Sequence, residues 1–267
     1  MARPVIALLT DFGSHDHYAG TMKGIALGIC ADATLVDITH DLPPHDVLAG
    51  ALELAACYRY FPSGTIFLVV VDPGVGSSRR GIAAEAGEYK FVAPDNGVLT
   101  IVFDEVPPKR MVELTERRYA RPTVSRTFEG RDRFAPAAGW LAKGIELSAL
   151  GRPAGAVQRL DVPRPQIEPG RLVGQVLRVD RFGNLITNID RKVFDQIAPA
   201  GSSSMLDFHV GPHQIGRVVS TYADAAAGEL CALFGSSDHL EIAANGSSAA
   251  TLLGLGRGTP VHIARRA

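Results

Sequence analysis

Three aspartates near the start of the chain each end a short apolar run, at a turn that contains Gly or Pro. They are Asp11, Asp72 and Asp95, and the runs before them read Val-Ile-Ala-Leu-Leu, Val-Val-Val and Phe-Val-Ala. Such runs are typical of strands that are buried on both faces of an α/β sheet. Ligands of open α/β sheets bind beyond the carboxyl ends of the strands. The pattern therefore predicts carboxylates at one rim of a sheet, where a carboxylate can act as a general base.

Two further segments of the first half concentrate polar residues. Residues 72–81 read Asp-Pro-Gly-Val-Gly-Ser-Ser-Arg-Arg-Gly, which indicates either a plain turn or a loop whose backbone N–H groups bind an anion. The segment has neither the Gly-Lys-Ser/Thr ending of a P-loop nor the GxGxxG of a dinucleotide fold. Residues 128–136 place charged side chains between two phenylalanines just before a helix. There, Asp132 is either a helix N-cap or part of a site.

In the second half, residues 180–184 interrupt a strand pattern with Asp-Arg-Phe-Gly-Asn. A hairpin loop explains this segment. Its carboxylate, aromatic ring and amide also suit an amino group and an adenine or ribose face. The histidines show no HExxH spacing, so we expect no metal site.

These segments need a scaffold, and the pattern up to about residue 150 alternates between strands and helices. Apolar spacing predicts helices at 18–30, 46–61 and 135–143, and β-rich runs predict strands at 34–38 and 65–71. Alternation of this kind is typical of βαβ units with a mainly parallel sheet.

After residue 150 the pattern changes. Residues 153–170 contain four prolines and are predicted to be a linker. Short strand-like runs follow, which is typical of a small antiparallel barrel or sandwich. These runs are 172–180, 185–189, 205–210, 230–234, 240–243 and 261–264. The sequence thus predicts the α/β class, with an N-terminal, mainly parallel α/β sandwich domain (1–152) and a small C-terminal antiparallel β-barrel domain (171–267).

Composition limits the kinds of partner. Hydrophobic residues make up 46% of the 267 residues, charged residues make up 21%, and the formal net charge is −1. These values fit a compact protein without a general attraction to nucleic acid or membrane surfaces. Cys30, Cys57 and Cys231 lie in apolar contexts without CxxC spacing, which favours free thiols in a reducing compartment. The apolar stretch before Asp11 is too short for a signal peptide, and no run is long enough to span a bilayer. We therefore expect a cytoplasmic protein.

Arginines cluster after residue 113. Arg117, Arg118 and Arg121 are interspersed with Glu113 and Glu116. Mixed charge of this kind favours a solvated face over a phosphate-binding patch.

The motifs occur together in the order of one family. The chain resembles the S-adenosyl-L-methionine (SAM) hydrolases, also called SAM hydroxide adenosyltransferases, which are relatives of the fluorinases and chlorinases. The resemblance runs from near the N-terminus to about Asn245 and implies a homotrimer that binds SAM between the N-domain of one subunit and the C-domain of the next. The motifs that carry it are Thr10-Asp11-Phe12-Gly13, Asp37-Ile38-Thr39-His40 to Pro43-Pro44, Asp72-Pro73-Gly74-Val75-Gly76, Pro94-Asp95-Asn96-Gly97, Thr127-Phe128, Gly130-Arg131-Asp132, Phe134-Ala135-Pro136 and Asp180 through Asn184.

Carried over by position, the resemblance implies catalytic and substrate-binding residues. Asp72 and Arg79 match two members of the water-activating Asp-Arg-His set of the hydrolases. Asp11 matches the carboxylate that binds the ribose hydroxyls. The other implied substrate-binding residues are Asp180 and Phe182 at the methionine amine and the adenine side, Asn184 at the adenine edge, and Phe128, Phe234, Ser237 and Asn245 around the pocket.

The third member of the water-activating set differs in this chain. Where the family pattern reads Phe-His-Gly-Arg-Asp, this sequence has Glu129. Glu129 is either a surface glutamate beside Arg131 or a catalytic group that shares the water with Asp72 through Arg79.

The resemblance implies hydrolysis of SAM to adenosine and L-methionine, by in-line attack of an activated water on C5′ and without a metal or other cofactor. A halide beside the Asp72 carboxylate, at about 4 Å and an effective dielectric constant of about 20, would be repelled by about 4 kcal/mol. Water is therefore the expected nucleophile. Two alternatives remain open, namely a SAM-dependent halogenase that forms 5′-halo-5′-deoxyadenosine and a non-catalytic SAM-binding sensor.

Overall fold

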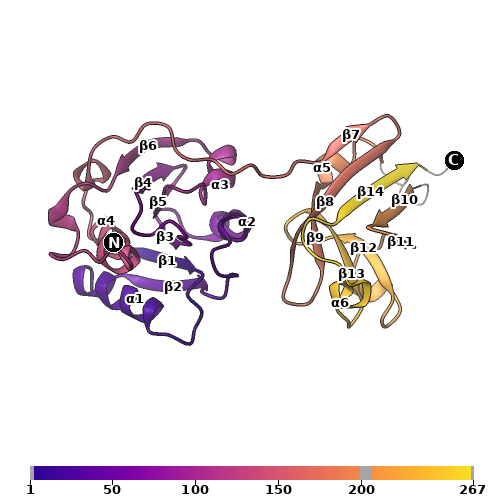
Figure 1. Ribbon diagram of the computed structural model, residues 1–267, viewed down its shortest axis with the longest axis horizontal. Helices are drawn as coiled ribbons and strands as arrows, with labels where there is room; N and C mark the ends of the chain where they lie inside the picture. The colour runs from indigo at the N-terminus through magenta and orange to yellow at the C-terminus, as the bar shows by residue number, and fades with distance from the viewer. Residues whose placement is uncertain (1–2, 199–205, 266–267) are drawn as a thin grey trace. The chain divides into compact units, whose positions relative to one another are not determined.

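The computed structural model describes residues 3–198 and 206–265, and the chain forms two compact units (Figure 1). Unit 1 comprises Met1–Asp161 and unit 2 comprises Val162–Ala267. Within residues 153–170, the segment Gln166–Glu168 is a strand, β7, which pairs with β8 of unit 2. No helix within the described ranges is both long and apolar enough to cross a membrane.

Unit 1 is built on a six-stranded sheet with the order β2-β1-β3-β5-β4-β6. The first four of these strands run parallel, whereas β4 pairs antiparallel with both of its neighbours. The sheet is therefore mainly parallel, as predicted, with an antiparallel edge. Its strands are β1 (Val5–Thr10), β2 (Thr34–Thr39), β3 (Ile66–Val70), β4 (Gly81–Ala86), β5 (Tyr89–Pro94) and β6 (Pro108–Glu113).

Helices cover both faces of this sheet, because the side chains of each strand alternate between the faces. In β1, Ile6 and Leu8 pack with α1 and α4, whereas Ala7 and Leu9 pack with α2 and α3. Figure 1 shows α1 and α4 on one side of the sheet and α2 and α3 on the other. The helical segments of unit 1 are α1 (Tyr18–Ile29), α2 (Val47–Cys57), η1 (Tyr58–Tyr60), α3 (Thr100–Glu105), η2 (Arg117–Tyr119), η3 (Gly130–Phe134), α4 (Ala135–Ala142) and η4 (Leu147–Leu150).

Local sequence signals explain where α2 begins and ends. The side chain of Asp46 accepts a hydrogen bond of 3.0 Å from the backbone N–H of Ala49, which caps the helix. After the short η1, the chain reaches Pro62, which cannot continue a helix. Gly50 lets α2 lie close to the sheet, because a Cβ at that position would be only 3.1 Å from the Val71 side chain.

Unit 2 is an antiparallel sheet that curls into a nearly closed barrel. Its strand order over the described residues is β11-β10-β14-β8-β9-β13-β12, with β7 paired to β8. The inward-facing side chains form one apolar core that includes Leu172, Ile189, Phe208, Ile242 and Ile263. The elements are β8 (Arg171–Val179), β9 (Leu185–Asp190), α5 (Arg191–Phe194), β10 (Leu206–Val210), β11 (His213–Ile215), η6 (Tyr222–Asp224), β12 (Leu230–Phe234), β13 (His239–Ala244), α6 (Ala249–Leu253) and β14 (Pro260–Arg265). The predicted strand over 205–210 includes Met205, which lies outside the described residues.

The three aspartates at strand ends follow neighbouring parallel strands, as predicted. β3 lies between β1 and β5, so Asp11, Asp72 and Asp95 lie at one edge of the sheet. Asp95 nevertheless does not face that edge freely. It is 4% exposed, pairs with the Arg80 guanidinium, and accepts a hydrogen bond of 2.8 Å from the backbone N–H of Gln158. Asp95 therefore anchors the segment that leaves unit 1, and the predicted rim of three carboxylates is reduced to two.

Candidate active site

The Asp72 carboxylate and the Arg79 guanidinium form a buried ion pair at the end of β3. Arg79 Nε donates to Asp72 Oδ1 at 2.8 Å and to Oδ2 at 3.0 Å, and Arg79 Nη2 also donates to Oδ2. The two side chains are only 5% and 9% exposed. A charge-assisted contact of this kind fixes the orientation of both groups.

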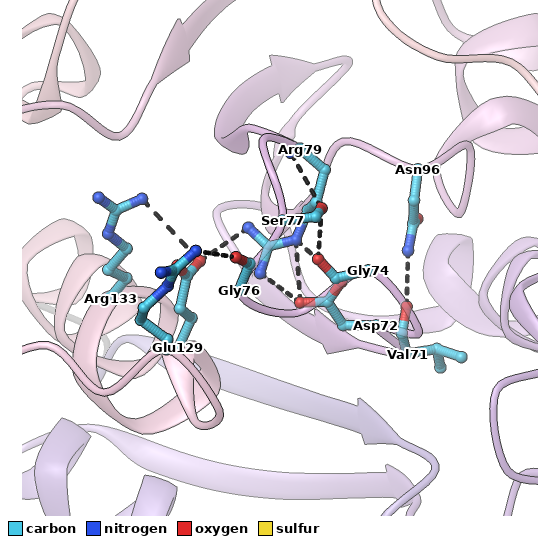
Figure 2. A network of polar contacts seen from close by, with 10 residues as sticks. Val71, Asp72, Gly74, Gly76, Ser77, Arg79, Asn96, Glu129 and Arg133 are labelled. Atoms are coloured by element: carbon cyan, nitrogen blue, oxygen red, sulfur yellow. Dashed lines mark hydrogen bonds and ion pairs between the residues drawn. The ribbon is translucent and has the colours of Figure 1, made fainter.

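Glu129 approaches Arg79 from a different part of the chain (Figure 2). Glu129 Oε2 lies 2.7 Å from Arg79 Nη1 and 3.9 Å from Arg133 Nη1. With 8% exposure, Glu129 is buried, which excludes the alternative of a surface glutamate, and Arg131 instead pairs with Asp132. The structure thus brings together the three side chains that the sequence predicts to be catalytic.

The contact between Arg79 and Glu129 leaves hydrogen-bonding capacity unused. Although Arg79 Nη1 and Glu129 Oε2 are 2.7 Å apart, the N–H is not aligned with the oxygen, so neither atom has a hydrogen-bond partner among the described residues. We regard the contact as an ion pair, because the distance is short and both groups are charged. Buried polar atoms usually have hydrogen-bond partners. These two atoms are fully buried, so each charge is compensated by the other group rather than by solvent.

The electrostatics of this array keep Arg79 charged. Burial alone would lower the pKa of Arg79, but the Asp72 and Glu129 carboxylates outweigh burial and raise the pKa above its ordinary value. The Arg79 guanidinium also lies over the Phe134 ring, at 5.1 Å from its centroid. The two carboxylates are balanced formally by the guanidinium groups of Arg79 and Arg133, of which Arg133 makes the longer contact, at 3.9 Å from Glu129.

A tight turn after β3 positions Asp72 and Arg79. Within it, Ser77 Oγ donates to the Gly74 carbonyl at 2.6 Å, and Arg126 Nη2 donates to the Gly76 carbonyl at 2.9 Å. Gly76 has φ +79°, and a Cβ there would be 2.4 Å from the Arg126 carbonyl oxygen. Glycine is therefore required at this position both for its backbone conformation and for the close approach.

The segment around Glu129 is a π-helical turn, η3, which leads directly into α4. Single π-helical turns are frequent at functional sites. Gly130 packs closely there, since a Cβ would be 3.1 Å from Met22 Sδ of α1. The preceding Phe128 is buried, and its ring makes edge contacts with Phe12 and Tyr18. Phe128 thus joins an aromatic cluster beside the turn after β1.

Asp11 lies in that turn after β1. Its Oδ2 accepts a hydrogen bond of 2.8 Å from the backbone N–H of His45. The backbone N–H of Gly13 donates to the His40 carbonyl at 2.7 Å, and the Thr10 hydroxyl lies 2.8 Å from His40 Nδ1. These contacts hold the turn against residues 40–45 and leave the second carboxylate oxygen of Asp11 without a recorded protein partner in the described part of the chain.

In unit 2, the Asp180 side chain organises the loop between β8 and β9. Its Oδ1 accepts hydrogen bonds from the backbone N–H groups of Phe182 (2.9 Å) and Asn184 (2.8 Å), and its Oδ2 accepts one from Asn184 Nδ2 (2.9 Å). Gly183 has φ +85° and lies against Ser248, where a Cβ would be 2.1 Å from the hydroxyl oxygen. The folded loop leaves Phe182 79% exposed, while Asn184 is buried. A projecting aromatic ring of this kind is available to stack on a planar ligand.

The remaining predicted site residues lie at two different places in unit 2. Phe234 and Ser237 lie at the hairpin that joins β12 to β13, and Phe234 packs on Phe194 and beneath Arg191. Asn245 lies at the opposite end of β13, where its Nδ2 donates to the Ala225 carbonyl at 2.8 Å. Within unit 2 these side chains therefore do not form one cluster.

Several residues that the sequence analysis did not single out complete these surroundings. Arg133 is spaced four residues from Glu129, which is a signal for contact on one helical face. In unit 2, the buried Glu241 accepts a hydrogen bond of 2.8 Å from the Tyr222 hydroxyl. Burial raises the pKa of Glu241, and the nearby Asp180 carboxylate raises it further. No local pattern in the sequence reveals that Glu241 lies near Asp180. Among residues 3–198 and 206–265, no group of three His, Cys, Asp or Glu side chains is arranged to hold a metal ion.

The fold and the site together define a class of two-unit proteins. The first unit is a mixed α/β unit in which a buried arginine, Arg79, lies between two carboxylates. The second is an antiparallel barrel with an Asp-organised loop. The sequence profile of the SAM hydroxide adenosyltransferase N-terminal domain matches residues 6–151, and that of the C-terminal domain matches residues 174–262. The chain belongs to this family.

Individual relatives agree with this assignment. An (R)-S-adenosyl-L-methionine hydrolase of Thermus thermophilus is 37% identical, over 98% of this chain and 99% of the relative. A fluorinase of Actinopolyspora mzabensis is 28% identical, over 99% of this chain and 98% of the relative. A crystal structure of an uncharacterized conserved protein from Thermotoga maritima superimposes with a TM-score of 0.92 at 35% identity, and it covers 97% of this chain and 100% of that protein.

Proposed function

We propose that this protein is an enzyme that hydrolyses SAM to adenosine and L-methionine. The observation that carries the proposal is the buried array of Asp72, Arg79 and Glu129, in which Arg79 fixes the orientation of the Asp72 carboxylate. We place the attacking water at Asp72. The (R)-SAM hydrolase of Thermus thermophilus, at 37% identity, supports the same reaction.

The chemistry requires little more than placement of a water molecule. The sulfonium of SAM is already a good leaving group, so no acid is needed. The water oxygen forms a bond to C5′ while the C5′–S bond breaks, and the bonding electron pair moves to sulfur and yields neutral methionine. Asp72 accepts the proton that the water loses, as a general base, and Arg79 holds Asp72 in position. Alignment of water, C5′ and sulfur supplies much of the rate increase.

The Asp72 carboxylate favours water over a halide as the nucleophile. A halide in the place of the water would lie directly against this buried carboxylate. Each like-charge pair at about 4 Å costs about 4 kcal/mol at an effective dielectric constant of about 20. The same charge attracts the cationic sulfonium. Hydrolysis is therefore favoured over halogenation, although a fluorinase is among the relatives.

We assign substrate binding to residues of both units. Asp11 binds the ribose hydroxyls and Phe128 lines the pocket in unit 1. In unit 2, Asp180 binds the methionine amine, and Phe182 stacks on the adenine. The remaining assigned residues are Asn184 at the adenine edge and Phe234, Ser237 and Asn245 around the pocket.

We also propose a homotrimer in which unit 1 of one subunit and unit 2 of the next share each site. The 79% exposure of Phe182 supports this arrangement, because a large aromatic side chain at a ligand site is expected to be covered. We place the reaction in the cytoplasm, since Cys30, Cys57 and Cys231 are free thiols, as is typical of a reducing compartment.

The decisive experiment incubates the purified protein with SAM in water labelled with ¹⁸O. The name of the Thermus relative specifies the (R) form, so each sulfur configuration is supplied separately. We expect adenosine with ¹⁸O in its 5′-hydroxyl, together with unlabelled methionine. Formation of 5′-halo-5′-deoxyadenosine in fluoride or chloride buffer would instead identify a halogenase. Tight binding of SAM without any product would identify a sensor.

A further inference from the structure

A hollow lies in unit 1, along the segment that follows β6. It has a volume of about 510 Å³, and its lining includes Arg117, Arg118, Arg121 and Arg133. This volume lies within the range of small-molecule sites. Arg133 comes from η3, whereas the other three arginines come from residues 117–121. Folding therefore joins a fourth arginine to the cluster for which the sequence favoured a solvated face over a phosphate-binding patch.

The hollow has a strong excess of positive charge. Its lining contains one acidic residue, Glu116, which lies 4.0 Å from Arg118. Arg121 contacts the buried Asp132 at 3.5 Å, and Arg133 contacts Glu129 at 3.9 Å. No hydrogen bond or ion pair occupies the Arg117 side chain within the described part of the chain. The guanidinium of Arg118, with a side chain 66% exposed, is accessible as well.

The backbone around the hollow is held in place at both ends. The buried Asp132 accepts a hydrogen bond of 2.8 Å from the Ser125 N–H through its side chain, and one of 2.9 Å from the Arg121 N–H through its carbonyl. At the other end, the Glu116 N–H donates to the Leu150 carbonyl at 3.1 Å. The backbone that carries the arginines is therefore fixed, which lowers the free energy lost to backbone ordering when a ligand binds.

The shape and lining of the hollow limit the ligand. Several guanidinium groups around one concave site match phosphate oxygens, which they bind through paired hydrogen bonds. The lining also contains Leu114, Pro122 and Val124, which can pack against an uncharged part of a ligand. The four arginines form a local cluster in a chain of net charge −1, which disfavours a nucleic acid or a membrane surface as the partner.

We propose that this hollow binds a small anion with at least two linked phosphate groups, either a free oligophosphate or the polyphosphate end of a nucleotide. Arg117 and Arg118 are the principal ligands, and Arg121 and Arg133 border the same anion. The hollow adjoins the candidate active site through Arg133, which contacts Glu129, but the proposal does not depend on the hydrolase activity.

Calorimetric titration of the full chain tests this proposal with inorganic triphosphate, cytidine triphosphate and orthophosphate. Cytidine triphosphate is used because an adenine nucleotide could enter the proposed adenosyl site. We expect triphosphate to bind more tightly than orthophosphate, with an affinity that falls as salt rises. Equal affinity for the two triphosphates identifies the oligophosphate as the recognised group, whereas tighter binding of the nucleotide identifies a nucleotide site. Each of these results supports the proposal.

A double variant, Arg117→Ala/Arg118→Ala, should weaken triphosphate binding at least tenfold, because each arginine supplies charge-assisted hydrogen bonds. The control, Arg59→Ala/Arg110→Ala, removes the same charge from side chains that are 55% and 56% exposed elsewhere in unit 1, and should bind as the unmodified protein does. Thermal unfolding verifies that both variants fold. Equal weakening in both variants, or no difference between triphosphate and orthophosphate, would overturn the proposal.

Discussion

At the scale of single residues, one guanidinium holds two carboxylates with different atoms. Arg79 uses Nε and Nη2 for Asp72, and Nη1 faces Glu129. The two carboxylates therefore have different surroundings. Asp72 is locked by several hydrogen bonds, whereas the Glu129 contact is a short but poorly aligned ion pair. We accordingly expect different consequences when each is replaced.

Replacing Asp72 should separate turnover from binding. In Asp72→Asn the shape is kept but the general base is lost, so kcat should fall by about 10²- to 10⁴-fold while the Kd for SAM changes little. Asp11→Ala serves as the comparison and should weaken binding by about 1.5–3 kcal/mol. Single-turnover kinetics and calorimetry measure the two effects. Equal losses of affinity in both variants would contradict these roles.

Replacing Glu129 tests whether it takes the place of the family's histidine. Glu129→Ala should reduce turnover by about 10²-fold, since the group that orients the water with Asp72 is lost. Glu129→His should retain substantial activity and change the dependence of kcat on pH. Glu116→Ala, which removes an exposed carboxylate from the same unit, should have no effect on turnover. An unchanged rate in Glu129→Ala between about pH 6 and pH 9 would show that Glu129 is a bystander.

At the scale of elements, two irregular segments rather than regular helices or strands present the catalytic groups. The turn of residues 72–79 follows a buried strand, and η3 interrupts the entry into α4. Each is held by contacts from distant residues, such as the hydrogen bond from Arg126 to the Gly76 carbonyl. Their conformations should therefore respond to changes that hardly affect the strands.

Gly76→Ala should damage the turn more than an equivalent glycine replacement elsewhere. The added methyl group would meet the Arg126 carbonyl oxygen at 2.4 Å, in addition to the strain of φ +79°. Gly64→Ala is the matched control, because Gly64 has φ +83° and open space around a Cβ. We expect about 1 kcal/mol of lost stability in the control and about 3 kcal/mol or more in Gly76→Ala, with reduced kcat. Denaturant unfolding and kinetics measure both, and similar losses in the two variants would contradict this account.

Asp132 should make the region of η3 sensitive to acid. Burial alone would raise its pKa, but hydrogen bonds from Arg131 and the Ser125 N–H, with the charge of Arg121, lower it below the ordinary value of 3.8. A lowered pKa in the folded state stabilises the protein fully above the pKa of the unfolded chain, and this stabilisation is lost as pH falls through the folded-state pKa. Asp132→Asn should thus cost about 3 kcal/mol at neutral pH and progressively less as the pH falls below 3.8. Urea unfolding of Asp132→Asn, with the exposed Asp16→Asn as control, checks this, and a difference that is independent of pH would exclude the mechanism.

At the scale of the whole molecule, the candidate catalytic array lies entirely in unit 1, whereas several assigned substrate residues lie in unit 2. The array needs no residue of unit 2 for its contacts. Binding of SAM, in contrast, is proposed to need both units, contributed by neighbouring subunits. The oligomeric state is therefore central to the proposed function.

Light scattering of the active enzyme should give the mass of a trimer. The isolated segment 1–161 should bind SAM poorly, because Asp180 and Phe182 are absent from it. Phe182→Ala in the full chain should weaken SAM binding by about 1–3 kcal/mol through lost stacking, without a change in the mass of the assembly. A monomer with full activity at micromolar concentration would rule out shared sites.

The sequence by itself determined the features that depend on local pattern. Apolar runs located β1, β3 and β5, and the cap at Asp46 located the start of α2. Two strands of unit 1 were missed. The inner strand β4 is rich in alanine, and the edge strand β6 contains Pro108, Lys109 and Arg110, so neither has the composition that is typical of a strand.

Only the tertiary structure decided which polar groups meet. Glu129 lies far from Arg79 in sequence and contacts it because η3 packs beside the turn after β3. Asp95 has the same local pattern as Asp72, but its carboxylate pairs with Arg80 and accepts a hydrogen bond from the Gln158 N–H. Arg133 lines the same hollow as the arginines of residues 117–121, because η3 also packs beside that segment. Charged side chains form pairs according to distance and burial, and both are set by the packing of segments that are remote in the chain.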